Sequence, residues 1–159
     1  MVKSGKRFIK MFRGSYEHTI DSKGRVSFPA QFRNILPKDN ERLVITNYYP
    51  AHLWAFTFED WNRLEQKLAA FPLTDPDTRS FKHFFVSGAH EVPIDKLGRI
   101  LIPPRLREYA HLNKELVFVG QITHIEIWNK ENWNSTFEAS ETNFEKVERK
   151  LADLGLKII

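Results

Sequence analysis

The sequence contains no cysteine among its 159 residues. Disulfides, thiol nucleophiles and cysteine metal sites are therefore excluded, as is typical of a protein in a reducing compartment. No run of about 18 apolar residues occurs, so we expect no membrane span. The opening MVKSGKRFIK is basic but lacks the apolar core of a secretory signal. Together these absences predict a cytoplasmic protein.

Recognisable catalytic motifs are also missing. The six histidines are scattered without HxxxH or HExxH spacing, and the seven glycines form neither GxSxG nor a phosphate-binding loop. We expect no enzyme activity, no catalytic residue, no metal, no cofactor and no small-molecule substrate. Because a catalytic group can assemble from distant residues, a pocket that joined two histidines and a carboxylate would favour an enzyme. The histidines are His18, His52, His83, His90, His111 and His124.

Charge is distributed unevenly along the chain. The net charge is +4, but residues 1–38 hold nine basic side chains against only two acidic ones, and the remainder is slightly acidic. An excess of positive charge at one end is expected of a surface that meets a polyanion. A basic tail that only aids solubility is the plainer alternative.

One motif occurs twice. IDSKGRVSFP (20–29) returns as IDKLGRILIP (94–103), a spacing of 74 that also superposes Arg33 on Arg107. The match continues through LVIT and LVFV, Leu53-Trp54 and Ile127-Trp128, and Glu-Asp-Trp and Glu-Asn-Trp. Similarity of order and spacing over most of both halves indicates an internal duplication.

Each copy predicts two short strands, a tight turn and a short helix. Alternating residues at 17–20 and 25–28 flank Asp-Ser-Lys-Gly, which predicts a β-hairpin, and the second copy has strands at 92–94 and 99–102. Pro29 and Pro103-Pro104 suit the start of a helix. Further strands are predicted at 43–47, 53–58, 116–120 and 124–128. Two such hairpins, related by a pseudo-two-fold axis, would bury each other's apolar faces.

Helices are predicted between and after the copies. Apolar stripes predict one helix over 61–71, ended by Pro72, and another that Asp75 caps and Pro76 begins. Their aromatic residues suit a core, or else a surface between subunits. Residues 141–155 form an amphipathic pattern in which Glu145 can pair with Arg149 and Gly155 ends the helix.

The repeated turn places an acid four residues before an arginine. Across a tight turn the carboxylate can accept backbone N–H groups and hold the guanidinium in one orientation. A held arginine suits phosphate or the O6/N7 edge of guanine. The alternative is that the pairs Asp21–Arg25 and Asp95–Arg99 only brace the turns, because surface ion pairs are common and individually weak.

The chain from Met11 to about Asn134 resembles the MraZ family of bacterial transcriptional regulators. MFRGSYEHTIDSKGRVSFPAQFR is similar to the family's opening, and VPIDKLGRILIPPRLREYA with IEIWNKENW is similar to its second half. The resemblance implies an α+β fold: a pseudo-two-fold swapped-hairpin, double-psi-like β-barrel of two tandem AbrB-type repeats with flanking helices. It also implies a homo-oligomeric ring.

The resemblance implies sequence-specific binding of double-stranded DNA, at short direct repeats in the promoter of a cell-division and cell-wall gene cluster, by a nucleoid-associated protein. At matching positions, Arg25 and Arg99 are expected to contact DNA. The other predicted site residues are the nearby lysines Lys23 and Lys96, the orienting acids Asp21 and Asp95, and the turn glycines Gly24 and Gly98. We also expect the first copy to dominate the electrostatics.

Two other functions remain open. A ring-shaped scaffold that binds proteins would use the aromatic helices as docking faces. RNA binding is less favoured, because no interleaved Phe and Tyr platform is evident. The predicted segments are a basic N-terminal extension (1–10), repeat 1 (15–62), a helical connector (63–90), repeat 2 (91–134) and a C-terminal amphipathic helix (135–159).

Overall fold

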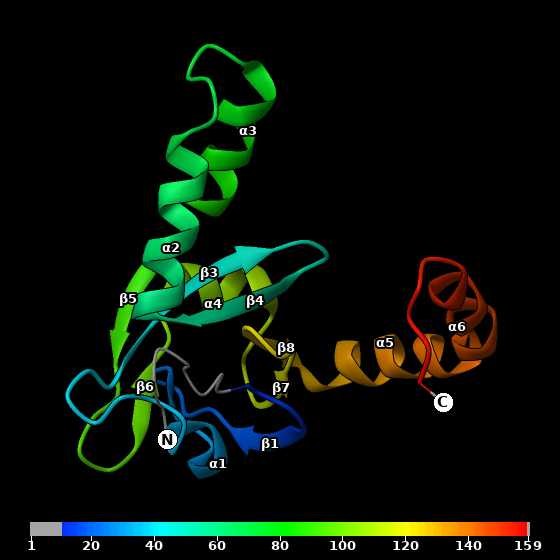
Figure 1. Cartoon of the computed structure of the whole chain (residues 1–159). Coiled ribbons are helices and arrows are strands. Elements are labelled where there is room, and N and C mark those ends of the chain that lie inside the picture. Colours follow the sequence, from blue (N-terminus) through cyan, green and yellow to red (C-terminus); the bar gives the residue numbers. More distant parts are fainter. Residues whose placement is uncertain (1–10, 159) are drawn as a thin grey trace, which may run out of the picture. The chain divides into compact units, whose positions relative to one another are not determined.

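The computed structural model describes residues 11–158, so the predicted basic extension over residues 1–10 lies outside the described residues. The described chain divides into two compact units, one up to Asn129 and one from Lys130 onward. The first unit holds all the strands and four helices (Figure 1). The predicted α+β class is confirmed.

The first unit contains a six-stranded antiparallel sheet in the order β1-β7-β8-β4-β3-β5 and a two-stranded sheet, β2-β6. The predicted strands are all present, with shifts of one or two residues at their ends. Their bounds are β1 Ser15–Thr19, β2 Arg25–Ser27, β3 Arg42–Tyr48, β4 His52–Thr57, β5 His90–Pro93, β6 Arg99–Leu101, β7 Glu115–Gly120 and β8 Ile125–Asn129. No closed barrel is seen among these strands.

The predicted local hairpins are wrong in their pairing. The turn itself is present: the N–H of Asp21 donates to the carbonyl of Arg25 at 2.9 Å. The flanking strands then separate: β1 pairs with β7 and β2 pairs with β6, so each strand finds its partner in the other half of the chain. Likewise β5 pairs with β3 and β6 with β2. The two halves therefore interleave.

One core lies between the two sheets. It buries one face of the large sheet against Val26 and Ile100 of the small sheet. The short helices α1 (Ala30–Arg33) and α4 (Pro104–Ala110) add Phe32 and Leu106, each about 1% exposed. Alternation along the strands selects this face, so Leu43 and Ile45 of β3 point into this core.

The opposite face of the sheet is covered by two helices. Helix α2 (Phe58–Ala69) and helix α3 (Pro76–Phe85) bring Trp61 and Phe85 onto Val44 and Phe56. The predicted cap is confirmed, since the Asp75 side chain accepts the N–H of Thr78. The aromatic stripes are core only in part, because Phe71, Phe81 and Phe84 are exposed.

The second unit is a pair of helices, α5 (Lys130–Thr142) and α6 (Phe144–Asp153). The amphipathic pattern over 141–155 corresponds to α6, which begins three residues later, whereas the first part of the predicted segment 135–159 belongs to α5. The expected pair is present, since Nη2 of Arg149 lies 3.2 Å from Oε2 of Glu145. Gly155 follows with a φ of +107°, as suits a residue that ends a helix.

Candidate nucleic-acid interface

The first turn is organised by the carboxylate of Asp21. Its Oδ1 accepts the backbone N–H groups of Lys23 and Arg25, both at 2.9 Å, and its Oδ2 accepts the Nε–H of Arg25 at 2.9 Å. Gly24 has a φ of +91°, which suits only glycine well. The backbone N–H of Arg25, followed by its guanidinium and the N–H of Lys23, lowers the pKa of Asp21 to about 2. The carboxylate is therefore charged at neutral pH.

The second turn repeats this arrangement. Oδ1 of Asp95 accepts the N–H groups of Leu97 and Arg99 at 2.9 Å, and Oδ2 accepts the Nε–H of Arg99 at 3.1 Å. The backbone N–H of Arg99 is the main cause that lowers the pKa of Asp95. Gly98 has a φ of +78°. The expected Asp–Arg contacts are thus present in both copies.

Each arginine is held by its Nε, so this bond leaves both terminal nitrogens available to an outside acceptor. The side chains of Arg25 and Arg99 are 41% and 35% exposed. Lys23 and Lys96 are exposed on the same turns. A guanidinium that is oriented but still accessible can bind a phosphate or a base edge in a bidentate manner.

The small sheet connects the two turns, which lie at its opposite ends because β2 and β6 are antiparallel. Val26 pairs with Ile100, its own counterpart at the spacing of 74, so a pseudo-two-fold axis passes through this pair. The flanking hydrogen bonds are reciprocal: Phe28 N–H donates to Gly98 O at 2.8 Å, and Ile102 N–H donates to Gly24 O at 2.9 Å. Equivalent turns 74 residues apart in sequence thereby flank one small sheet.

Two arginines without a predicted role also belong to this site. A Cβ built on Gly24 would lie 2.5 Å from Nε of Arg107, and one built on Gly98 would lie 2.9 Å from Nη1 of Arg33. Each helix arginine therefore lies against the turn of the other repeat. The superposition of Arg33 on Arg107 was the available sequence signal, but the crossing between repeats depends on strand pairing.

Two histidines and a carboxylate do come together elsewhere. The Nε2 atoms of His52 and His124 lie 3.8 and 4.0 Å from Oε2 of Glu126. His52 stacks on Trp128, and the ring centroids of His124 and Trp54 are 3.9 Å apart. Burial lowers the pKa of both histidines, that of His124 to about 4. The group is packed between the indoles of Trp54 and Trp128.

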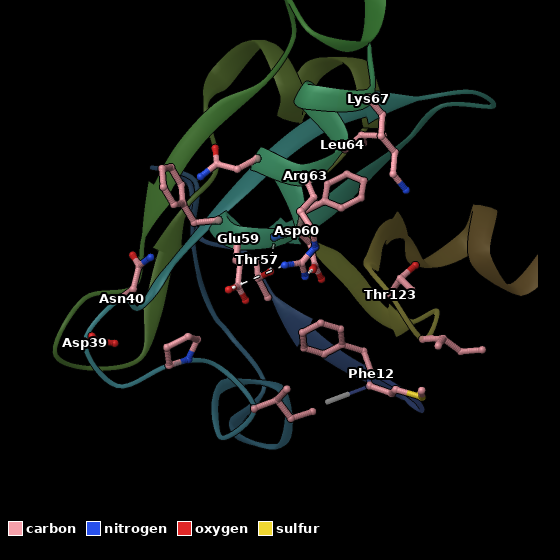
Figure 2. Close-up of a pocket in the computed structure, with 17 residues that line it drawn as sticks. Phe12, Asp39, Asn40, Thr57, Glu59, Asp60, Arg63, Leu64, Lys67 and Thr123 are labelled. Carbon is pink, nitrogen blue, oxygen red and sulfur yellow. Dashed lines mark hydrogen bonds and ion pairs between the residues drawn. The ribbon is translucent and has the colours of Figure 1, made fainter. Parts of the chain in front are cut away.

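A groove of about 1200 Å³ lies at the start of α2 (Figure 2). Phe12, Asp39 and Thr123 come to it from three other segments, and no histidine lines it. Arg63 pairs with Glu59 and Asp60 of its own helix, as the dashed lines in Figure 2 show. The charges of the side chains that line this groove are thus largely balanced by one another, unlike the charges on the two turns.

Over residues 11–158, no three His, Asp or Glu side chains are arranged to hold a metal ion. None of the helices in that range is long and apolar enough to cross a membrane.

Comparison with known proteins accounts for the duplicated architecture. A family model described as "MraZ protein, putative antitoxin-like" matches the chain twice, over residues 11–84 and 85–154. The chain belongs to the MraZ family. Three relatives named "Transcriptional regulator MraZ" come from Thermoanaerobacter sp. (strain X514), Caldanaerobacter subterraneus subsp. tengcongensis and Thermoanaerobacter pseudethanolicus. They are 44%, 42% and 44% identical over 146 residues, which is 92% of this chain and 100% of each relative.

MraZ proteins are named as regulators and not as enzymes. The two successive matches correspond to the duplication found in the sequence and to the interleaved strands. The finer segment boundaries, and the roles of the individual site residues, remain predictions.

Proposed function

We propose that this protein is a DNA-binding transcriptional regulator that binds short direct repeats in the promoter of a cell-division and cell-wall gene cluster. One observation carries the proposal: two oriented arginines, Arg25 and Arg99, lie on turns joined by the same two-stranded sheet. The names of its MraZ relatives support the regulatory role.

In this proposal each residue of the turn has a distinct role. Arg25 and Arg99 contact DNA, and Asp21 and Asp95 orient them by accepting the Nε–H. Lys23 and Lys96 add positive charge beside the arginines. Gly24 and Gly98 allow the positive φ of the turn, and they also leave room for an arginine from the opposite repeat.

We also propose the swapped-hairpin form of the fold. Pairing of β1 with β7 and of β5 with β3 supports it, because these two pairs are equivalent under the internal repeat. The N–H of Ile20 donates to Lys114 O and that of Ile94 donates to Glu41 O, which extends the same pseudo-symmetry. A closed double-psi-like barrel would need further pairing between the two sheets.

Assembly into a homo-oligomeric ring completes the proposal. Several subunits bound to successive DNA repeats act through a high effective concentration, so each contact can be weak. The loss of the ring should therefore reduce affinity more than the loss of one arginine. Such a protein would act in the cytoplasm, associated with the nucleoid.

The proposal is tested by fluorescence anisotropy on DNA that carries direct repeats from the promoter. A matched duplex keeps the same composition but scrambles the repeats. We expect clearly tighter binding to the repeats, since a regulator must exceed its own non-specific affinity. Equal affinity for both duplexes would contradict sequence-specific binding and favour the protein-binding scaffold.

A further inference from the structure

The two helix arginines have different electrostatic surroundings. Nη2 of Arg33 donates to Oε1 of Glu41 at 2.8 Å, and the two side chains are only 30% and 20% exposed. The hydrogen bond from Arg33 lowers the pKa of Glu41, which therefore remains ionised at neutral pH. The positive charge that Arg33 brings to the Asp95 turn is thus largely neutralised.

Arg107 lacks such a partner. Its Nε donates to the carbonyl oxygen of Ile102 at 2.9 Å, a neutral acceptor. Within residues 11–158 no carboxylate forms an ion pair with Arg107. Its charge remains available beside Gly24.

The residue that replaces Glu41 in the second repeat has the opposite charge. The carbonyl of Glu41 accepts the N–H of Ile94, and the carbonyl of Lys114 accepts the N–H of Ile20. Since Ile20 and Ile94 are themselves equivalent, Lys114 occupies the backbone position that Glu41 has in the first repeat. A carboxylate in one half therefore becomes an ammonium group in the other.

We propose that the two turns are unequal DNA sites, and that Glu41 sets the difference by neutralising Arg33. The Asp21 turn, with Arg25, Lys23 and the unneutralised Arg107, makes the stronger phosphate contact. The Asp95 turn carries the matching Arg99 and Lys96, but its helix arginine, Arg33, is paired to Glu41, so it makes the weaker contact. This inference depends on the proposed DNA-binding function and specifies how the site is used.

Unequal turns give the pseudo-symmetric module a direction. Two identical turns related by a two-fold axis would fit an inverted repeat equally well in both orientations. A module whose halves differ in charge has a preferred orientation on a non-palindromic sequence. Such polarity is what direct repeats require, because every subunit must then bind in the same orientation.

Four single substitutions test the inference in a salt series on repeat DNA. Arg107→Gln should flatten the slope of log K against log salt by about 0.9 for each phosphate contact that is lost, whereas Arg33→Gln should change it little. Glu41→Gln frees Arg33 and should steepen the slope. With one added phosphate contact, the ratio of variant to wild-type affinity should be roughly 3-fold larger at about 50 mM salt than at about 200 mM. Lys114→Glu, which supplies a carboxylate near Arg107, should flatten the slope.

The Arg33→Gln and Glu41→Gln variants are matched controls, because both remove the same ion pair. They should lower the unfolding temperature by similar amounts and yet affect DNA binding differently. Equal slopes for Arg107→Gln and Arg33→Gln, or weaker binding by Glu41→Gln, would overturn the inference while leaving DNA binding intact. If wild type does not distinguish repeat from scrambled DNA, the proposed function itself fails.

Discussion

Replacing Gly24 with alanine tests whether the Asp21 turn is built around Arg107. The new Cβ would lie 2.5 Å from Nε and 2.7 Å from Cζ of Arg107, at a residue whose φ is +91°. The positive φ alone costs about 1–2 kcal/mol for a non-glycine residue. Displacing Arg107 also weakens its bond to Ile102 O, which adds about 0.5–1.5 kcal/mol. We expect a total loss of about 1.5–3.5 kcal/mol in the free energy of unfolding.

Gly98→Ala is the matched comparison. It has the same kind of φ strain, but its Cβ would approach only Nη1 of Arg33 at 2.9 Å, the far end of a flexible side chain. We expect a loss of about 1–2 kcal/mol, which comes mainly from the backbone. The difference between the two variants therefore isolates the contribution of Arg107.

Differential scanning calorimetry at one fixed protein concentration measures both variants. In a chain of this size 1 kcal/mol lowers the unfolding temperature by about 2–4 °C, so Gly24→Ala should lower it by about 3–14 °C. The shift for Gly98→Ala should be smaller. A shift for Gly98→Ala that equals or exceeds that of Gly24→Ala would refute the proposed packing of Arg107 against the first turn.

Two further predictions concern ionisable groups. Asp21→Asn removes a negative charge that repels DNA, so a purely electrostatic effect would tighten binding. We instead expect weaker binding in an anisotropy assay, because Arg25 loses its orientation. Tighter binding would disprove the orienting role of Asp21. His124 has a pKa of about 4 in the folded chain against about 6.5 when unfolded, so the unfolded state takes up the proton first. Stability should be full above pH 6.5 and fall between pH 6.5 and 4, on the order of 1–2 kcal/mol after solvent screening. Urea titrations should show that His124→Gln flattens this pH dependence, and an unchanged slope would count against it.

The sequence predicted the local features of this fold well. The Asp–Arg contacts join residues four apart across a tight turn, so their geometry depends only on the turn itself. The strand positions follow from alternation, and the start of α3 follows from Asp75 and Pro76. The spacing of 74 correctly identified equivalent positions in the two repeats.

Strand pairing was not predictable from the same patterns. A local hairpin and a pairing across repeats give identical alternation, so nothing in residues 17–28 distinguishes β2-β6 from a pair of β1 and β2. Arg33 and Arg107 were overlooked for this reason, since each meets a turn that is distant in sequence. The cluster of His52, His124 and Glu126 likewise depends on β4 and β8 being neighbours.

The central claim is that the paired turn arginines bind DNA, and one measurement tests it most directly. Fluorescence anisotropy over a salt series compares wild type, the Arg25→Ala/Arg99→Ala variant, and a Lys67→Ala/Arg79→Ala control that removes two positive charges from α2 and α3. We predict a steep slope of about 0.9 per phosphate contact for wild type and the control. The arginine variant should remain folded but lose both the slope and the preference for direct repeats. If all three proteins bind alike, the twin turns are structural braces and the claim is wrong.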